Sequence, residues 1–156
     1  MADVALTPPE HEIVGVDTSV FIYHFEGSSE FGSTAARVLE EIASGRCLGV
    51  TSVITMMEIA VQPFALGRID IGDQYDVWLS NVPNLQIVDV TSRVTRRAAQ
   101  FRAEYRLFPA DALQIAATAV HGATAFVCND LRLRRVSIPK IVVLDDYTQS
   151  QPPALR

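Results

Sequence analysis

The stretch Ile13-Val14-Gly15-Val16-Asp17 joins four apolar residues to a single acid. A short apolar run of this kind predicts a strand buried on both faces, as the strands of parallel sheets are. The acid then lies at the carboxyl end of the strand, which is the edge where sites assemble in parallel α/β sheets. The stretch therefore predicts both the fold class and the position of a functional site.

Four further apolar runs follow and alternate with segments of helical period, which is typical of α/β proteins. We expect a three-layer α/β/α sandwich with a mostly parallel, five-stranded sheet. The predicted strands cover residues 13–16, 47–50, 85–90, 124–128 and 141–144. No repeat, linker or low-complexity tract divides the chain, so we expect one domain over residues 1–156, with a core at about 13–146 and short polar tails.

Capping and turn residues delimit the predicted helices. Thr51 or Ser52 caps the helix that carries Glu58, and Pro63 marks the end of this helix or a kink in it. The other helices are expected at residues 18–25, 34–44, 70–82, 92–107 and 110–121, with a helical turn at 131–136.

The formal net charge of −5 hides a segregation of charge along the chain. Residues 91–135 contain eight arginines and three acids, a net charge of +5, whereas the remainder has five basic and fifteen acidic residues, a net charge of −10. A basic segment fits attraction of phosphate, and a solvated helix face explains the same arginines equally well. Lys140 is the only lysine, which favours the planar, two-pronged contacts that arginine makes.

Composition excludes several classes of protein. At 49% hydrophobic residues, the chain can build a real core, and no apolar stretch reaches the roughly 20 residues that span a bilayer. Residues 1–10 lack the basic flank and apolar core of a secretory signal, so we expect a cytoplasmic protein without membrane association. Cys47 and Cys128 lie in apolar surroundings, which favours buried, reduced thiols over a disulfide or a zinc site.

Four acids lie where a carboxylate is costly unless another group compensates its charge: Asp17, Glu58, Asp111 and Asp130. Two of them follow apolar strands, one lies in the first turn of a helix, and Glu58 lies on a mostly apolar helix. A divalent cation compensates several carboxylates at once. Because the set is rich in oxygen and has no histidine or thiolate nearby in sequence, it suits Mg²⁺ or Mn²⁺ better than zinc.

Each acid also has a structural explanation. Asp17 could be only a helix N-cap, and Asp111 only a first-turn acid favoured by the helix dipole. Asp130 could accept the hydrogen bond of an Asx-turn, and Glu58 could pair with an arginine. None of the three histidines is positioned as an obvious general base, which argues against a histidine-driven ribonuclease.

Four segments of the chain resemble the sequence blocks of PIN-domain ribonucleases. Val16–Ile22 resembles their opening strand and first acid, and Thr51–Glu58 resembles their glutamate-bearing helix. Pro109–Ala117 and Val127–Arg132 resemble their third and fourth acidic blocks. The likeness covers residues 13–146 with every block in order, and in size the chain is similar to the toxin of bacterial VapBC toxin–antitoxin pairs.

The resemblance implies a doubly wound fold and an endoribonuclease that depends on Mg²⁺ or Mn²⁺. It implies that the four acids hold the metal, and that a metal-activated water attacks the phosphodiester in line, leaving 5′-phosphate and 3′-hydroxyl ends. It also implies a homodimer and an antitoxin that covers the site. Supporting roles are implied for Thr18 (or Ser19) and Asn129.

Single-stranded or looped RNA is the expected substrate, because its bases are accessible. Arg132, Arg134 and Arg135 directly follow Asp130 and are expected to contact the RNA backbone. A second, weaker set of candidates for backbone contacts is Arg93, Arg96 and Arg97.

A non-catalytic binding module is the alternative function, in which the acids hold a structural cation or the arginines of a partner. A nucleotide-binding protein is disfavoured because the chain has neither a Gly-x-Gly-x-x-Gly run nor a P-loop. A haloacid-dehalogenase-like phosphatase needs Asp-x-Asp after the first strand, and this chain has Asp17-Thr18-Ser19.

Overall fold

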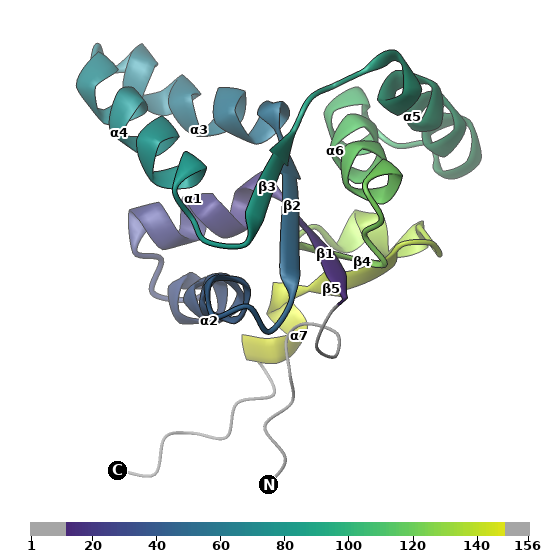
Figure 1. The fold of residues 1–156 in the computed structure, drawn as a ribbon, viewed down its shortest axis with the longest axis horizontal. Helices are drawn as coiled ribbons and strands as arrows, with labels where there is room; N and C mark the ends of the chain where they lie inside the picture. The colour runs from purple at the N-terminus through teal and green to yellow at the C-terminus, as the bar shows by residue number, and fades with distance from the viewer. Residues whose placement is uncertain (1–11, 149–156) are drawn as a thin grey trace, which may run out of the picture.

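The five strands form one sheet in the order β3-β2-β1-β4-β5, as the computed structural model of residues 12–148 shows (Figure 1). All four strand pairs are parallel, and the apolar β1 lies at the centre. The expected parallel five-stranded sheet is therefore confirmed. The strands are β1 (Ile13–Val16), β2 (Leu48–Ser52), β3 (Leu85–Val88), β4 (Ala125–Cys128) and β5 (Lys140–Val143).

Helices cover both faces of the sheet, which makes the three layers that the sequence predicts (Figure 1). One side carries α1 (Thr18–Glu26), α2 (Gly32–Ala43), α3 (Val53–Ala65), α4 (Ile69–Ser80) and α7 (Leu144–Thr148). The other carries α5 (Ser92–Tyr105) and α6 (Pro109–Val120), with the short 3₁₀ helix η1 (Leu131–Arg135) after β4.

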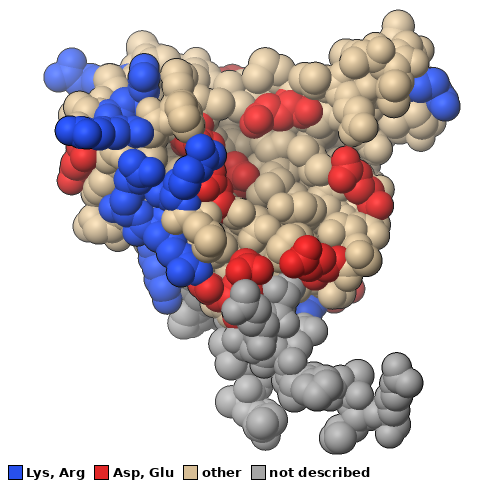
Figure 2. Space-filling view, turned by 180° about the vertical axis from the view of Figure 1, so that it is seen from behind, with Lys and Arg blue, Asp and Glu red and all other residues tan. Residues whose placement is uncertain are grey.

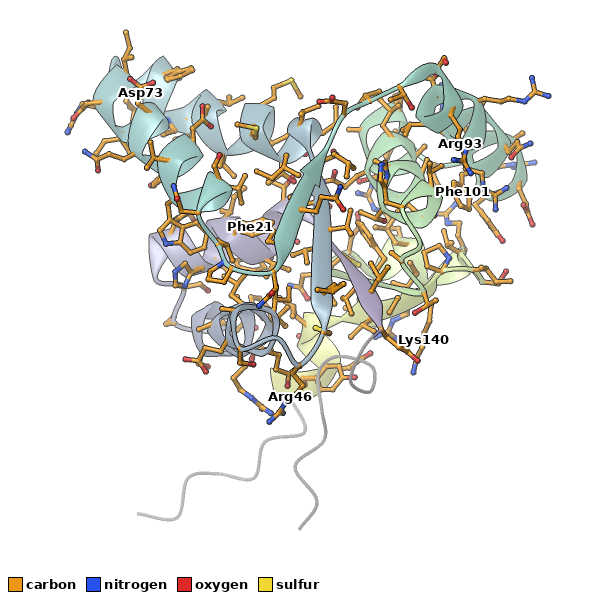
Figure 3. The ribbon with its side chains drawn as sticks, in the orientation of Figure 1. Phe21, Arg46, Asp73, Arg93, Phe101 and Lys140 are labelled. Atoms are coloured by element: carbon orange, nitrogen blue, oxygen red, sulfur yellow. The ribbon has the colours of Figure 1, made fainter. Side chains whose placement is uncertain are left out.

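Each face of the sheet has its own apolar core. Phe21 of α1 lies in one core and Phe101 of α5 in the other, on opposite sides of the strands (Figure 3). Gly15 in β1 allows α6 to approach closely, because a Cβ there would lie 2.6 Å from Thr118 Oγ1 and 2.8 Å from Phe126 Cδ2. The central strand and α6 are thus packed directly together.

Some element boundaries differ from the sequence prediction. Thr51 continues β2 instead of capping α3, because its hydroxyl donates to the carbonyl of Val16 in the neighbouring strand. Ser52 is the cap, and its Oγ accepts the Ile54 N–H at 3.1 Å. Pro63 does not end α3. It lies inside the helix, which ends at Ala65.

The end of the last strand was also predicted wrongly. Leu144 begins α7 rather than ending β5, and the backbone N–H of Asp145 donates to Asn129 Oδ1 at 3.0 Å. This side-chain acceptor satisfies one of the first amides of the helix, which no helical carbonyl can reach. The expected polar tails fall mostly on residues 1–11 and 149–156, outside the described residues.

Two class predictions can be compared with the fold. Cys47 and Cys128 are both buried and neither forms a disulfide, as expected. Across residues 12–148, every helix is too short or too polar to cross a membrane.

Candidate active site

Asp17 and Asp130 are carried to the same edge of the sheet by neighbouring strands. β1 and β4 are parallel, with Val16 opposite Val127, and each is followed by one of the acids. The backbone N–H of Asp17 donates to the carbonyl of Val127 at 2.9 Å, so the two strand ends are tied together. Both acids therefore lie at the carboxyl edge, where the sequence places them.

Asp111 and Glu58 reach this edge from helices on either side. Asp111 lies in the first turn of α6, and burial together with the charges of Asp17 and Asp130 raises the pKa of its carboxyl. Glu58 lies on α3, and its charge contributes to the raised pKa of Asp17. Asp17 is thus within electrostatic reach of Glu58 and Asp111, and Asp111 is within reach of Asp130.

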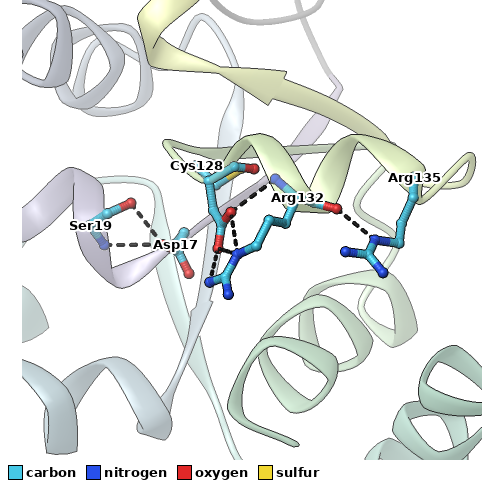
Figure 4. Close-up of polar contacts among 6 residues, drawn as sticks. Asp17, Ser19, Cys128, Arg132 and Arg135 are labelled. Atoms are coloured by element: carbon cyan, nitrogen blue, oxygen red, sulfur yellow. Dashed lines mark hydrogen bonds and ion pairs between the residues drawn. The ribbon is translucent and has the colours of Figure 1, made fainter. Parts of the chain in front are cut away.

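Asp17 caps α1 and is held by Ser19. Its Oδ2 accepts the Ser19 Oγ hydroxyl at 2.7 Å and the Ser19 N–H at 3.2 Å (Figure 4). Burial is the main reason that the pKa of Asp17 is raised, and the two hydrogen bonds from Ser19 oppose it. The N-cap role foreseen as an alternative is real, yet a cap does not require the burial that this carboxylate has.

Asp130 is engaged by Arg132, two residues further along η1. It accepts hydrogen bonds from the Arg132 backbone N–H at 2.9 Å, from Nε at 3.0 Å and from Nη2 at 2.7 Å (Figure 4). These bonds hold the pKa of Asp130 below its usual value. The Asx-type contact foreseen as an alternative is therefore present as well.

Glu58 is half-buried, and a hydroxyl rather than an arginine donates a hydrogen bond to it. The Thr18 hydroxyl donates to Glu58 Oε1 at 2.8 Å, and no ion pair between Glu58 and an arginine occurs in the part of the chain that the structure describes. In residues 12–148 no three acidic, histidine or cysteine side chains are arranged to hold a metal ion. Asp17, Glu58 and Asp130 are each turned toward a donor of the protein itself.

Comparisons with known proteins identify the family. A family model, PIN domain, matches residues 14–139, which is most of the chain. The chain belongs to the PIN-domain family. No curated protein matches it significantly.

Solved structures with the same fold as this PIN domain belong to complexes. One is VapBC2 from Rickettsia felis bound to a DNA fragment from their promoter, with 18% identity, a TM-score of 0.65, and coverage of 83% of this chain and 96% of that one. A toxin–antitoxin complex from Klebsiella pneumoniae has 22% identity and a TM-score of 0.63, and the match covers 85% of this chain and 97% of that one. DNA-bound VapBC from Salmonella typhimurium has 18% identity and a TM-score of 0.62, and the match covers 86% of this chain and 98% of that one.

The predicted supporting residues of the PIN domain lie beside the acids in different ways. Thr18 donates to Glu58, and Ser19 donates to Asp17. Asn129 joins α1 to α7 behind Asp130, because its Nδ2 donates to the Tyr23 hydroxyl at 3.1 Å and its Oδ1 accepts from Asp145. Asn129 therefore shapes the backbone that carries Asp130.

The arginines after Asp130 are exposed and already engaged within the PIN domain. Arg132 binds Asp130, Arg134 forms an ion pair with Asp146, and Arg135 donates to the carbonyls of Arg132 at 2.8 Å and Tyr105 at 3.2 Å. Figure 2, which views the molecule from behind, shows basic side chains gathered on one side of this face, with acidic ones beside them.

The weaker set of arginines lies at the other edge of the sheet. Arg93, Arg96 and Arg97 line a hollow together with Ala123 and Pro139. Ala123 precedes β4 and Pro139 precedes β5, so in this parallel sheet the hollow lies at the amino edge, opposite the acids.

Sequence reasoning missed a group of buried polar residues behind Glu58. Gln114 is only 1% exposed and lies on the mostly apolar α6, next to hydroxyls from three other elements. A polar amide among Leu113, Ile115 and Ala116 was the signal that could have revealed it, since buried polar groups need partners.

Proposed function

We propose that this PIN domain is a metal-dependent endoribonuclease and the toxin of a toxin–antitoxin pair. The observation that supports this most is the gathering of four carboxylates at one edge of the sheet, from α3, α6 and the ends of β1 and β4. Two of them, Asp17 and Asp111, have raised pKa values, mainly because burial disfavours the charged carboxylate and also because neighbouring carboxylates add like charge. A site that holds buried carboxylates close to one another fits a cation better than it fits a structural role.

The donor set fits a hard divalent cation. Asp17, Glu58, Asp111 and Asp130 offer only oxygen atoms, which Mg²⁺ and Mn²⁺ prefer. The burial and like charges that raise the pKa of Asp17 and Asp111 are the penalties that a cation removes. These four residues would hold the metal, while Cys128 is buried with its pKa raised to about 12 and supplies no thiolate ligand.

The bound cation would neutralise phosphate charge and lower the pKa of a water for in-line attack. The residues of the chain itself have preparatory roles. Ser19 holds Asp17 at the end of β1, and Thr18 holds Glu58 from the same turn of helix. Arg132 places a guanidinium beside the acids, where it offers hydrogen bonds to phosphate oxygens.

The RNA is proposed to be single-stranded or looped, with its backbone along Arg132, Arg134 and Arg135. These side chains are exposed on η1, directly beyond Asp130. Arginine can grip phosphate with two parallel hydrogen bonds, and neutralised phosphates contribute most of the affinity in nucleic-acid binding.

The proposed partner is a small antitoxin that covers the site. The chain itself is proposed to be a single domain that forms a homodimer and works in the cytoplasm. Support comes from the solved structures of the same fold, which are toxin–antitoxin and VapBC complexes. Over 80% of this chain aligns with nearly the whole of each matched chain, so the extent of the fold is the same.

Cleavage of RNA by the purified protein tests the proposal. We expect cleavage that EDTA abolishes and Mn²⁺ restores, and that Asp17→Asn or Asp111→Asn removes while the protein stays folded. Asp70→Asn is the matched control, because Asp70 is exposed and paired with Arg68 on α4. Full activity of either site variant would contradict the assignment.

The alternative function is a binding module without catalysis, and the Arg132–Asp130 pair is the observation that favours it. Arg132 neutralises one acid internally, as a partner's arginine would do in such a module. Mn²⁺ binding without any cleavage of single-stranded RNA would support this alternative. Cleavage that is lost in Asp111→Asn would exclude it.

A further inference from the structure

A chain of buried polar side chains connects Glu58 to the interior of the protein. Five of them, contributed by α1, β2, α3 and α6, are at most 4% exposed: Thr18, Thr51, Ser52, Thr55 and Gln114. Polar groups at such depth cost free energy unless they are hydrogen-bonded, so the direction of each bond matters.

The direction can be worked out from Thr51. Its hydroxyl donates to the carbonyl of Val16 at 2.9 Å, and a hydroxyl has only one hydrogen. In the 2.7 Å contact between Thr51 and Thr55, Thr51 must therefore accept and Thr55 must donate. Thr55 then has no hydrogen left to give to Thr18, which lies 3.1 Å away.

Gln114 completes the pattern from the other side. Its Nε2 donates to Thr55 Oγ1 at 2.6 Å and to Thr18 Oγ1 at 3.2 Å. Its Oε1 accepts the hydroxyl of Ser52, whose Oγ in turn accepts the N–H of Ile54. The amide is thus fixed with its nitrogen toward the two threonines.

Thr18 is left with one hydrogen and two acceptors. Glu58 Oε1 lies 2.8 Å from Thr18 Oγ1, whereas Thr55 Oγ1 lies 3.1 Å away and already accepts from Gln114. A charged acceptor at the shorter distance makes the stronger hydrogen bond. The hydroxyl of Thr18 therefore points to Glu58.

We propose that Gln114 is a positioning residue, whose side-chain amide directs the hydroxyl of Thr18 onto Glu58 and so holds that carboxylate ready for a divalent cation. The role of Glu58 as a metal ligand rests on the proposed function. The direction of the hydrogen bonds rests only on the geometry of the five buried side chains.

The variant Gln114→Met keeps the length of the side chain and removes both donors. In its metal-free crystal structure we expect Glu58 Oε1 to leave hydrogen-bond distance of Thr18 Oγ1. We expect the dissociation constant for Mn²⁺, measured by calorimetry, to rise about tenfold, as is typical when a residue that orients a metal ligand is lost. We expect kcat to fall by a similar factor with the KM for RNA unchanged, because arginines bind the RNA.

Thr118→Val is the matched control. Thr118 is also buried on α6, one turn beyond Gln114, and its hydroxyl donates only within its own helix, to the carbonyl of Ile115 at 3.0 Å. This variant loses a buried hydroxyl from the same helix without touching the chain of hydroxyls. We expect it to bind Mn²⁺ and cleave RNA as the wild type does.

A double-mutant cycle tests whether Gln114 acts through Thr18. In a Thr18→Val background, Gln114→Met should weaken Mn²⁺ binding no further, because the hydroxyl that Gln114 directs is gone. Multiplied effects of the two changes would overturn the proposal. So would Mn²⁺ binding by Gln114→Met that equals binding by Thr118→Val.

Failure of the proposed function and failure of the Gln114→Met variant to fold can each be distinguished from failure of the role of Gln114. If the wild type neither binds Mn²⁺ nor cleaves RNA, the proposed function fails, and the position of Glu58 in the metal-free structures still decides the role of Gln114. If Gln114→Met does not fold, Gln114→Glu keeps the shape of the side chain and reverses its donors into acceptors. An unmoved Glu58 in that variant would overturn the proposal.

Discussion

Arg132 folds back onto Asp130, with Nη2 2.7 Å from Oδ2 and Nε 3.0 Å from Oδ1. The guanidinium therefore occupies the carboxylate that a cation would also need, and the same hydrogens would be needed to grip phosphate. Arg132 is 60% exposed, and exposed ion pairs contribute little to stability because solvent screens them. The pair is consequently one that a cation can replace at small cost.

Removing Arg132 should tighten metal binding. In Arg132→Gln we expect the dissociation constant for Mn²⁺ to fall by roughly two- to fivefold, as for loss of a competing surface ion pair. Calorimetry on the metal-free protein measures this. Arg68→Gln is the control, because Arg68 grips Asp70 with the same two-pronged geometry away from the site. Weaker Mn²⁺ binding by Arg132→Gln would show that Arg132 supports the metal instead of competing with it.

The carboxyls of Asp17 and Asp111 should make the metal-free protein less stable as pH rises. Asp17 and Asp111 have pKa values raised above 3.8, so the folded state resists their ionisation. Their contribution to stability is fully present below pH 3.8 and is lost as pH rises through the raised values. Asp130, whose pKa is lowered, acts in the opposite sense and loses its contribution as pH falls.

Asp111→Asn should therefore stabilise the metal-free protein at neutral pH. A gain of about 0.5–2 kcal/mol is common for a single stabilising substitution. Each kcal/mol corresponds to about 2–4 °C in Tm for a chain of this size. Thermal unfolding in EDTA at pH 4 and pH 7 measures the effect, which should vanish at the lower pH. A lower Tm for the variant at pH 7 would contradict the electrostatic reading of the site.

Contacts between arginine and phosphate should appear in the salt dependence of RNA binding. For single strands, each lost contact lowers the slope of log K against log salt by about 0.7. We expect this loss for Arg135→Gln, measured by fluorescence anisotropy with a short oligonucleotide in an Asp111→Asn background. Arg93→Gln should keep the slope, since Arg93 lies at the amino edge. Equal slopes for the Asp111→Asn protein and for its Arg135→Gln and Arg93→Gln derivatives would show that the RNA binds elsewhere.

The thiol of Cys128 should be inert in the native protein. Burial raises its pKa to about 12, so almost no thiolate exists at neutral pH. Alkylation followed by mass spectrometry should label Cys128 only after urea is added. Rapid labelling of the native protein would show that the segment around β4 opens readily.

The five strands and their parallel pairing could be predicted because short apolar runs have few alternatives to a buried parallel sheet. The end at Leu144 could not, since the start of α7 depends on Asn129, sixteen residues earlier, accepting the amide of Asp145. The choice between Thr51 and Ser52 as the cap of α3 stayed open for a similar reason, because a carbonyl of the neighbouring strand satisfies the Thr51 hydroxyl. Local sequence does not contain such distant partners.

The candidate site, like the fold, could be predicted only in part from the sequence. The elements that carry the four acids could be read from the sequence, since each acid stands out against an apolar context. The contact between Arg132 and Asp130 depends on the tight turn of η1, and the environment of Gln114 is assembled from three other elements. Those relations arise only once the chain has folded.

The order of the sheet divides the molecule into two complementary pieces. Strands β1 to β3 lie side by side and come from the first part of the chain, and β4 and β5 come from the second. A cut between Val88 and Ser92 would leave Asp17 and Glu58 on one fragment and Asp111 and Asp130 on the other. The first fragment is acidic and the second basic, so they attract each other. Neither fragment holds all four proposed ligands, so the proposed site would form only when the two pieces pair along β1 and β4.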